Sequence, residues 1–476
     1  MDEFLSDVYT VVFRQWILEK EDKNFNIYLK ENNDSIIVIE TNYCHSEVRF
    51  NRMNIIEFEV TNKVNNNIEF YLHFQMKTLK HAIELFNEML ETIHKLVDKP
   101  RVKILLSCTG GLTTGYFAQR LNEAVLMLSL DYEFNAVPYD DLYEVGQNYD
   151  LILLAPQIGY MKAKVQEILQ DKKVIRLSSH IFAKYDVVGA LQLIGDELKN
   201  NSEKKKSLDK PLSLKRAIHK NMKILSIAMI RVSQRVLLEY RIYDEDNHIL
   251  LDNEIIKNRI SMDDICDILD IVFVQYSDIH FIGISMPGIV NDGHLMLKKE
   301  GFDNTDVVGI LSNKYNKTFI LCNDVNSIAV GYYATQNNYS SFSFLFQPKN
   351  AFSGVGSIFK GQLIQGRKNI AGEVQYLPFY LEEDALSKTR TPEGTLEIVG
   401  KTAVSIIGIL APEALVFACQ FITDKEELIN EVEKYIPKEY IPDIIKIDNL
   451  QEYNLLGTMI LCVQSLNNQK SLDNTL

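Results

Sequence analysis

Cys108 is the residue whose surroundings most clearly predict chemistry in this sequence. It ends an apolar stretch that begins near Lys103 and is followed by Thr-Gly-Gly-Leu-Thr-Thr-Gly and then a helical pattern. A helix that starts directly after a strand points its free amides and its positive dipole end at the preceding residue. The same field lowers the pKa of a thiol and makes it a nucleophile. A loop of this kind can cradle a thiophosphate or another oxyanion. The loop residues are Thr109, Gly110, Gly111, Leu112, Thr113, Thr114 and Gly115.

The elements that must position this loop follow from the hydrophobic pattern around it. Between residues 102 and about 200, short apolar strand patterns alternate with helical ones. Such alternation predicts a parallel sheet with helices on both faces, where sites form at the points at which strands end and helices begin. We therefore expect 101–200 to form a parallel α/β domain with Cys108 at the carboxyl end of its first strand.

The rest of the chain divides into three segments. A length of 476 residues suggests roughly three domains. Residues 1–98 contain period-two strand patterns between two helical ones, which predicts an α+β domain of unknown role. Residues 201–220 are charged, polar and proline-containing, as in a linker. A second α/β unit follows over 221–476, so the fold class is α/β multidomain.

Composition excludes several classes of protein. The net charge of −14 and the pI of about 5.3 argue against a nucleic-acid partner, which requires a basic surface. No apolar run reaches the roughly 18 residues of a membrane helix. The acidic amino terminus is unlike a secretory signal, and the six cysteines include no CxxC pair, which is typical of reduced thiols. We expect a cytoplasmic protein without a membrane partner.

Two motifs in residues 101–200 carry a resemblance. The Cys108 loop is followed by a segment that places Leu153, Leu154, Pro156, Gln157 and Tyr160 in the pattern LLxPQxxY. Together they resemble IIB proteins of the lactose/cellobiose class of the bacterial phosphotransferase system. The resemblance implies that Cys108 takes a phosphoryl group from a histidine of a IIA partner and passes it to sugar entering through a IIC channel.

Two other kinds of site share features with this loop. A buried cysteine before an ordinary strand-to-helix turn gives the same pattern. A low-molecular-weight cysteine phosphatase requires Cys-x5-Arg, because the arginine clamps the phosphate with two hydrogen bonds. The sixth residue after Cys108 is Thr114, which disfavours a phosphatase.

The C-terminal half carries a second resemblance, in the segments FIGISMPGIVNDGHL, FILCNDVNSIAVGYYA and FSGVGSIFKGQLIQGRKNIAGEVQYLPF. These resemble the ROK family of repressors, open reading frames and sugar kinases, whose fold has two actin/hexokinase-like lobes around a sugar cleft. The resemblance implies that Asp324 stands at the position of the base that accepts the sugar hydroxyl proton. It also implies a sugar or sugar phosphate ligand and a homodimer. The implied sugar-binding residues are Ser285, Asn323, Asp324 and Glu373.

The phosphate-binding motifs of that family are altered here. Ala228 stands at the aspartate of the family's Asp-x-Gly-Gly-Thr turn, and 230–232 read Ile-Arg-Val. A turn without glycine cannot bring backbone amides close to phosphate. Ala418 and Cys419 replace the Gly-Gly that accommodates adenosine, although 353–357, SGVGS, keep the glycines of the second phosphate loop.

The family's structural zinc site is altered as well. Tyr376 replaces its histidine, and the stretch LEEDALSKTRTPEGTLE after it has no cysteine. We therefore expect no cofactor, because both the ATP and the zinc sites are lost, and we expect a pseudokinase.

The sequence as a whole predicts a carbohydrate-responsive regulator. It would sense phosphotransferase phosphoryl flux at Cys108 and a sugar or sugar phosphate in a degenerate ROK cleft. The alternatives are an active ROK-type sugar kinase, a IIB phosphocarrier in sugar uptake, and a ROK-type transcriptional repressor. Asp324 favours a kinase, but an aspartate there can equally cap the next helix. A repressor needs an amino-terminal helix-turn-helix, whereas 1–98 is strand-rich.

Overall fold

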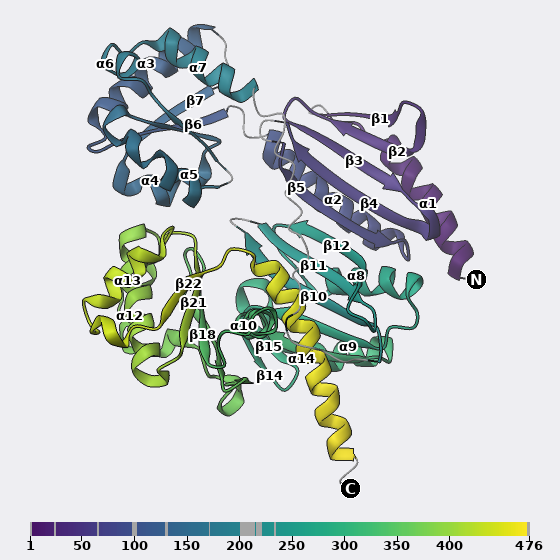
Figure 1. Ribbon diagram of the computed structural model, residues 1–476. Coiled ribbons are helices and arrows are strands. Elements are labelled where there is room, and N and C mark those ends of the chain that lie inside the picture. The colour runs from purple at the N-terminus through teal and green to yellow at the C-terminus, as the bar shows by residue number, and fades with distance from the viewer. Residues whose placement is uncertain are drawn as a thin grey trace.

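The computed structural model describes residues 2–22, 25–63, 66–97, 102–128, 132–170, 172–199, 215, 221–232 and 235–473. The predicted linker at 201–220 lies outside these residues except for Lys215, as does the end of the tail at 474–476. Figure 1 shows an N-terminal domain (2–97), a middle domain (102–199) and a C-terminal half (221–473). The domain boundaries given above stay a prediction.

The N-terminal domain is an antiparallel sheet with two helices on one face (Figure 1). Aromatic side chains fill the space between the layers. Phe86 of the second helix meets Phe58 of the sheet nearly at right angles, and both are fully buried. The elements are α1 (Asp2–Leu18), β1 (Asn26–Lys30), β2 (Asn33–Glu40), β3 (Cys44–Phe50), β4 (Ile55–Asn62), β5 (Ile68–Gln75) and α2 (Leu79–Val97).

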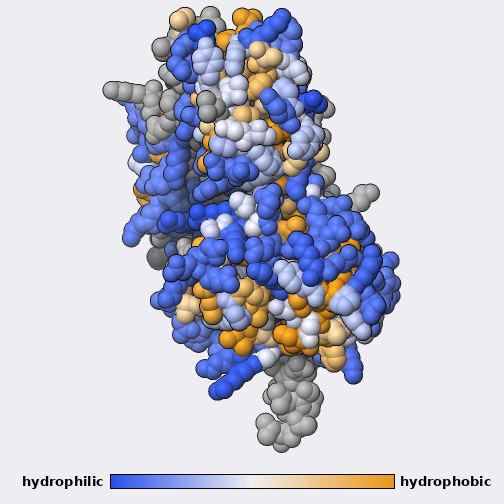
Figure 2. Space-filling model, turned by 90° about the vertical axis from the view of Figure 1, so that its left-hand side faces the viewer, coloured by the Kyte–Doolittle hydropathy of each residue, from blue (hydrophilic) through white to orange (hydrophobic). Residues whose placement is uncertain are grey.

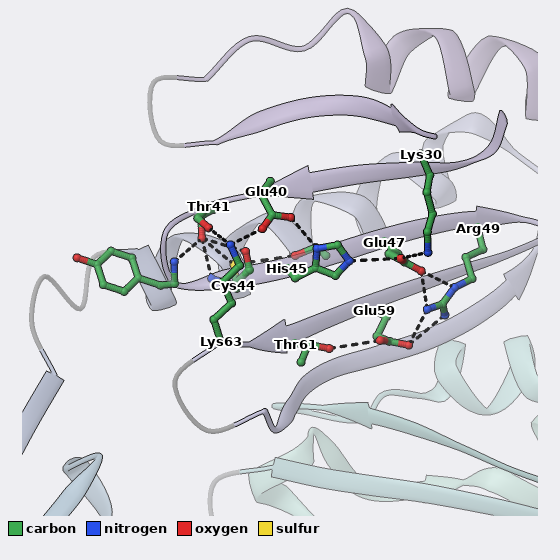
Figure 3. Close-up of polar contacts among 12 residues, drawn as sticks. Lys30, Glu40, Thr41, Cys44, His45, Glu47, Arg49, Glu59, Thr61 and Lys63 are labelled. Atoms are coloured by element: carbon green, nitrogen blue, oxygen red, sulfur yellow. Dashed lines mark hydrogen bonds and ion pairs between the residues drawn. The ribbon is translucent and has the colours of Figure 1, made fainter. Parts of the chain in front are cut away.

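The opposite face of this sheet carries a ladder of ion pairs, drawn in Figure 3. Lys30 and Arg49 both reach Glu47, at 2.7 and 2.8 Å, and His45 reaches Glu40 at 2.6 Å. Burial alone would raise the pKa of Glu47, but hydrogen bonds from these cations and from His45 outweigh it and lower the pKa to about 2. The charges of this face therefore satisfy one another within the sheet.

The middle domain is the predicted parallel sheet, with strand order β7-β6-β8-β9. Figure 1 shows α3, α6 and α7 on one face and α4 and α5 on the other. The elements are β6 (Val102–Cys108), α3 (Leu112–Leu128), β7 (Tyr132–Pro138), α4 (Tyr139–Val145), β8 (Leu151–Leu154), α5 (Lys162–Ile168), β9 (Lys173–Arg176), α6 (Ser179–Ala183) and α7 (Val187–Lys199).

The C-terminal half has two lobes, as the resemblance implies. The first lobe contains β10 (Ile224–Val232), β11 (Arg235–Tyr243), β12 (Ile249–Lys257), α8 (Met262–Gln275), β13 (Phe281–Met286), β14 (Ile289–Asn291), β15 (His294–Leu297), β16 (Phe302–Asp306), α9 (Val307–Tyr315) and β17 (Thr318–Asn323). The second lobe contains β18 (Phe342–Gln347), β19 (Gly354–Phe359), β20 (Gln362–Leu363), α11 (Ala385–Lys388), α12 (Pro392–Leu410), β21 (Ala414–Cys419), α13 (Lys425–Glu433) and β22 (Asp443–Lys446).

Two helices, α10 (Asp324–Thr335) and α14 (Leu450–Asp473), pack against each other between the lobes (Figure 1). Glycines allow the close approach. A Cβ at Gly331 would lie 2.0 Å from the Tyr453 carbonyl oxygen, and one at Gly457 would lie 1.7 Å from the Ser327 carbonyl oxygen. Larger residues at these positions would push the two helices apart.

The N-terminal domain and the first lobe share one sheet. β5 pairs antiparallel with β12 at Tyr71 and Ile256, so the described strands join into a ten-stranded sheet. His73 contacts the Tyr240 hydroxyl, and its burial lowers its pKa to about 4. His81 pairs with Asp267 at 2.9 Å. The N-terminal domain therefore packs against the first lobe, through the shared sheet, these contacts and a common apolar core.

The middle domain instead packs on the second lobe. Buried side chains of α4 and α5 form one apolar cluster with residues of β21, α12 and α13. In Figure 2 the middle domain lies above the second lobe, and the larger groups of apolar side chains lie on the second lobe. The N-terminal domain thus pairs with the first lobe and the middle domain with the second, although the middle domain lies between the N-terminal domain and the first lobe in the sequence.

Two further expectations concern the cysteines and the membrane. All six cysteines are buried and unpaired, as predicted for reduced thiols. Within the described ranges, no helix is both long enough and apolar enough to cross a membrane.

Candidate functional site

Cys108 lies where the sequence pattern predicts it. It is the last residue of β6, which runs between β7 and β8, and it pairs in register with Pro138 at the end of β7. The helix α3 begins four residues later, and the cysteine is 4% exposed. The sulfur is thus held at the carboxyl edge of a parallel sheet, directly ahead of a helix amino terminus.

The loop supplies hydrogen-bond donors to the sulfur. The Gly111 amide donates to Cys108 Sγ at 3.1 Å, and Thr114 Oγ1 lies 3.3 Å from it. Burial alone would raise the pKa of this thiol. Hydrogen bonds from the Thr114 hydroxyl and from the amides of Gly110, Gly111 and Thr114 outweigh burial and hold the pKa below its usual value.

The two threonines of the loop differ. Thr114 is buried, and its hydroxyl also donates to the Gly111 carbonyl oxygen at 2.9 Å. A hydroxyl has one proton, so Thr114 must turn that proton from the carbonyl to the sulfur when the thiolate forms. Thr113 is exposed, and the contact between a loop threonine and the sulfur is made by Thr114.

Backbone conformation fixes the loop against the neighbouring strand. Gly111 has φ of +77°, which favours glycine, and a Cβ there would lie 3.3 Å from Pro138 Cδ. Gly111 therefore both donates its amide to the sulfur and packs on Pro138.

The second candidate site lies at the amino end of α10. The Asn323 side chain caps this helix by accepting from the Asn326 amide at 3.1 Å, and it donates to the Gly288 carbonyl oxygen at 2.9 Å. Gly288 has φ of +101°. The Ser-x-Pro-Gly turn is thereby tied to the start of the helix that carries Asp324.

Asp324 and Glu373 come from different parts of the C-terminal half, and the charge of Glu373 acts on Asp324. Burial, and secondarily the charge of Glu373, raise the pKa of Asp324 to about 7. Burial also raises the pKa of Glu373. Gly372 holds Glu373 in place, because its φ is +90° and a Cβ there would lie 1.7 Å from the Val355 carbonyl oxygen. Glu373 therefore lies near enough to Asp324 for its charge to affect the pKa of Asp324.

Two buried polar atoms at this site have no protein partner among the described residues. They are Ser285 Oγ and Asn326 Oδ1, in residues that are 0% and 7% exposed. Buried polar atoms of this kind mark where a ligand or an ordered water binds. Sequence reasoning included Ser285 but missed Asn326, whose spacing of three residues from Asn323 places it on the same turn of the helix.

The expected loss of the ATP site stays a prediction, and the structure shows what occupies the positions of the phosphate-binding motifs. β10 continues as a strand through Arg231, which pairs with Glu300, where a phosphate-binding turn would be required. In the retained SGVGS segment, a Cβ at Gly354 or Gly356 would lie 2.8 or 2.7 Å from atoms of Val325 in α10. These glycines are explained by packing of β19 against α10.

The expected loss of the zinc site stays a prediction. Tyr376 is 57% exposed. A search of the described residues finds no group of three or more histidine, cysteine, aspartate or glutamate side chains arranged to hold a metal ion.

Comparisons with known proteins match two segments of the chain. Residues 103–188 match the family model "PTS system, Lactose/Cellobiose specific IIB subunit", and residues 239–385 match the ROK family model. The oligo-beta-mannoside-specific EIIB component of Bacillus subtilis (strain 168) is 29% identical over 65 residues, or 14% of this chain and 63% of that protein. The match thus spans less than two thirds of that relative's length.

Two solved structures are also similar. The lactose-specific IIB component domain of Streptococcus pneumoniae has 24% identity and a TM-score of 0.19, covering 20% of this chain and 96% of that chain. A ROK family protein from Streptococcus pneumoniae TIGR4, in complex with sucrose, has 18% identity and a TM-score of 0.41, covering 52% of this chain and 100% of that chain.

The chain therefore carries a IIB domain of the lactose/cellobiose type followed by a ROK domain. The middle domain contains the first match, and the second match lies within the C-terminal half. This pair of domains points to a sugar-related kinase or regulator family.

Proposed function

We propose that this protein is a carbohydrate-responsive regulator that carries a phosphoryl group on Cys108 and binds a sugar or sugar phosphate beside Asp324 and Glu373. The observation that carries the proposal is the environment of the Cys108 sulfur, which accepts from the Gly111 amide and contacts the Thr114 hydroxyl. Both groups stabilise negative charge on sulfur. The sequence has no arginine at the position from which a cysteine phosphatase clamps phosphate.

The phosphoryl donor in this proposal is a phosphohistidine on a IIA partner. The Cys108 thiolate attacks phosphorus, and the S–P bond forms as the P–N bond breaks. The electron pair of the broken bond stays on the imidazole nitrogen. Because no arginine assists hydrolysis, we expect the thiophosphate to persist and to report phosphoryl supply.

The C-terminal half supplies ligand recognition in this proposal. Ser285 Oγ and Asn326 Oδ1 are buried without a protein partner in the described structure, which suits a ligand rich in hydroxyl groups. Asp324 and Glu373 add acceptors for such hydroxyls. We propose that ATP and zinc are not cofactors, and that the chain assembles as a homodimer.

A sugar kinase is the second candidate, favoured by one observation. A carboxyl pKa of about 7 suits a general base at neutral pH, and Asp324 has that value. The strand at Arg231 opposes a kinase because it leaves no phosphate-binding turn. A coupled assay over a broad sugar panel discriminates: ATP turnover that Asp324→Asn abolishes would establish the kinase.

A ROK-type repressor would need an amino-terminal helix-turn-helix, and the described residues of the N-terminal domain contain none. There the two helices are separated by five antiparallel strands.

Ligand binding is tested by thermal shift with sugars, sugar phosphates and ATP in separate wells. A ligand that binds only the folded state raises the melting temperature by mass action. We expect a shift with at least one sugar or sugar phosphate, a smaller shift in Glu373→Gln, and an unchanged one in the exposed control Glu383→Gln. A shift with ATP alone, or a sugar shift that ignores Glu373→Gln, would contradict the proposal.

A further inference from the structure

The Cys108 loop is connected to the second lobe through α4. Cys108 pairs with Pro138 in register, and Gly111 packs on Pro138. α4 begins at the next residue, Tyr139. A change of charge or volume at the sulfur therefore acts on the segment that leads directly into α4.

The far side of α4 is buried against the second lobe. The Tyr139 and Tyr143 hydroxyls lie 2.5 Å apart, and Tyr143 is 1% exposed. Its ring meets that of Phe421, just beyond β21, with centroids 5.9 Å apart and planes nearly perpendicular. Lys349 of the second lobe donates to the Tyr143 carbonyl oxygen at 2.7 Å and also lies over the Phe421 ring.

The neighbouring helix α5 is anchored separately by charge. Lys164 pairs with Glu427 at 2.8 Å, and Lys446 pairs with Glu167 at 3.1 Å. Gln420 also donates to the Ile168 carbonyl oxygen. Because α5 has its own contacts, α4 can shift while the middle domain stays attached to the second lobe.

Acidic side chains around α4 would oppose a negative charge added at the Cys108 sulfur. Asp140 and Asp141 occupy its first turn and are exposed, as is Glu144. On the second lobe, Glu393 lies near enough to Tyr139 to add to the effect of burial in raising its pKa. Asp140 and Asp141 follow Pro138, the partner of Cys108 in the sheet, by two and three residues. A phosphoryl group on Cys108 adds a charge of about −1.5 to −2, which these carboxylates would repel.

We propose that a negative charge on Cys108 loosens α4 from the second lobe, so that the lobe senses the state of the cysteine through Tyr143 and Phe421. This inference rests on the proposed function, in which Cys108 carries a phosphoryl group. It adds the route by which that group reaches the half of the protein that binds the sugar.

The test uses two alkylating reagents and needs no partner protein. Iodoacetate leaves a carboxylate on the sulfur, and iodoacetamide leaves a neutral amide of nearly the same size. Hydrogen exchange is measured on peptides covering 139–145 and 420–427. Peptides of the N-terminal domain serve as an internal reference, and treated Cys108→Ser serves as the control for labelling elsewhere.

We expect exchange in both segments to be on the order of threefold faster with the carboxylate adduct than with the amide adduct. Phe421→Ala with the amide adduct should reproduce the faster exchange of 139–145, because it removes the contact directly. Equal exchange in the two adducts would overturn the inference. Neither reagent depends on a IIA protein. Equal exchange would therefore not count against phosphorylation of Cys108, which a separate phosphoryl-transfer assay tests. If Cys108 takes up neither reagent, the description of the thiol fails and the inference fails with it.

Discussion

The surroundings of Cys108 and those of Asp324 and Glu373 shift the pKa of an acidic group in opposite directions. Around Cys108, amides and a hydroxyl outweigh burial, and the thiol pKa falls. Around Asp324, burial and a neighbouring carboxylate outweigh the Val325 amide, and the pKa rises to about 7. The surroundings of Cys108 favour the charged form of the thiol, whereas those of Asp324 and Glu373 disfavour the charged form of each carboxyl group.

This difference favours a separate role for each half in the proposed function. We propose that the loop in the middle domain carries the phosphoryl group, because it supplies donors to the Cys108 sulfur. In the C-terminal half, Ser285 and Asn326 offer buried polar atoms suited to hydroxyls, and Arg231, at the position of the family's phosphate turn, pairs with Glu300. In this proposal, phosphoryl chemistry and sugar recognition are divided between the two halves.

The largest expected effect is selective alkylation of Cys108. At neutral pH, iodoacetamide should add one group, seen by intact-mass spectrometry and lost in Cys108→Ser. Burial raises the pKa of Cys322 to about 12 from 9.0, which leaves roughly 1,000-fold less thiolate than an ordinary cysteine. Burial likewise raises the pKa of Cys44, Cys419 and Cys462. Labelling that persists in Cys108→Ser would contradict the claim that Cys108 is the reactive thiol.

A smaller effect is expected from Asp324→Asn on stability. The folded-state pKa, about 7, is raised above the ordinary 3.8, so ionisation of this carboxyl costs stability as the pH rises between these values. The substitution removes that cost. The melting temperature should rise by about 2–4 °C at pH 8 and barely change at pH 4. The exposed control Asp303→Asn should show no such dependence. An equal gain at both pH values would contradict the raised pKa.

The smallest expected effect separates the two threonines of the loop. Thr114→Val removes the hydroxyl near the sulfur and should raise the Cys108 pKa. Thr113→Val is the matched control and should leave it unchanged, because Thr113 is exposed. The pKa is measured from the dependence of alkylation rate on pH. The same pKa in both variants would show that the hydroxyl does not support the thiolate.

Much of the fold could be predicted from local pattern. Period-two alternation gave the strands of the N-terminal domain, and alternation of strand and helix gave the parallel sheet of the middle domain. The position of Cys108 followed from the same pattern, because a strand that ends before a glycine-rich turn and a helix has few alternative geometries. Asp324 and Glu373 required a resemblance, since 49 residues separate them and neither spacing nor period relates them.

The contacts between domains could not be predicted. Nothing in the sequence around His73 or His81 links them to the C-terminal half, yet they contact Tyr240 and Asp267 of the first lobe. The helix α4 has only seven residues, too few for a clear period, and was not expected from the sequence. Its contact with Phe421 joins positions almost 280 apart, and such long-range pairing leaves no local signal.

The central claim is that Cys108 accepts a phosphoryl group, and the most direct test is transfer from phosphorylated IIA proteins of the lactose/cellobiose class. Each IIA is first shown to phosphorylate a control IIB, such as the Bacillus subtilis EIIB relative. We predict that intact-mass spectrometry finds one added phosphoryl group on this protein with at least one donor, and none in Cys108→Ser. Transfer to the control IIB proteins from every donor, without transfer to this chain from any, would contradict the account.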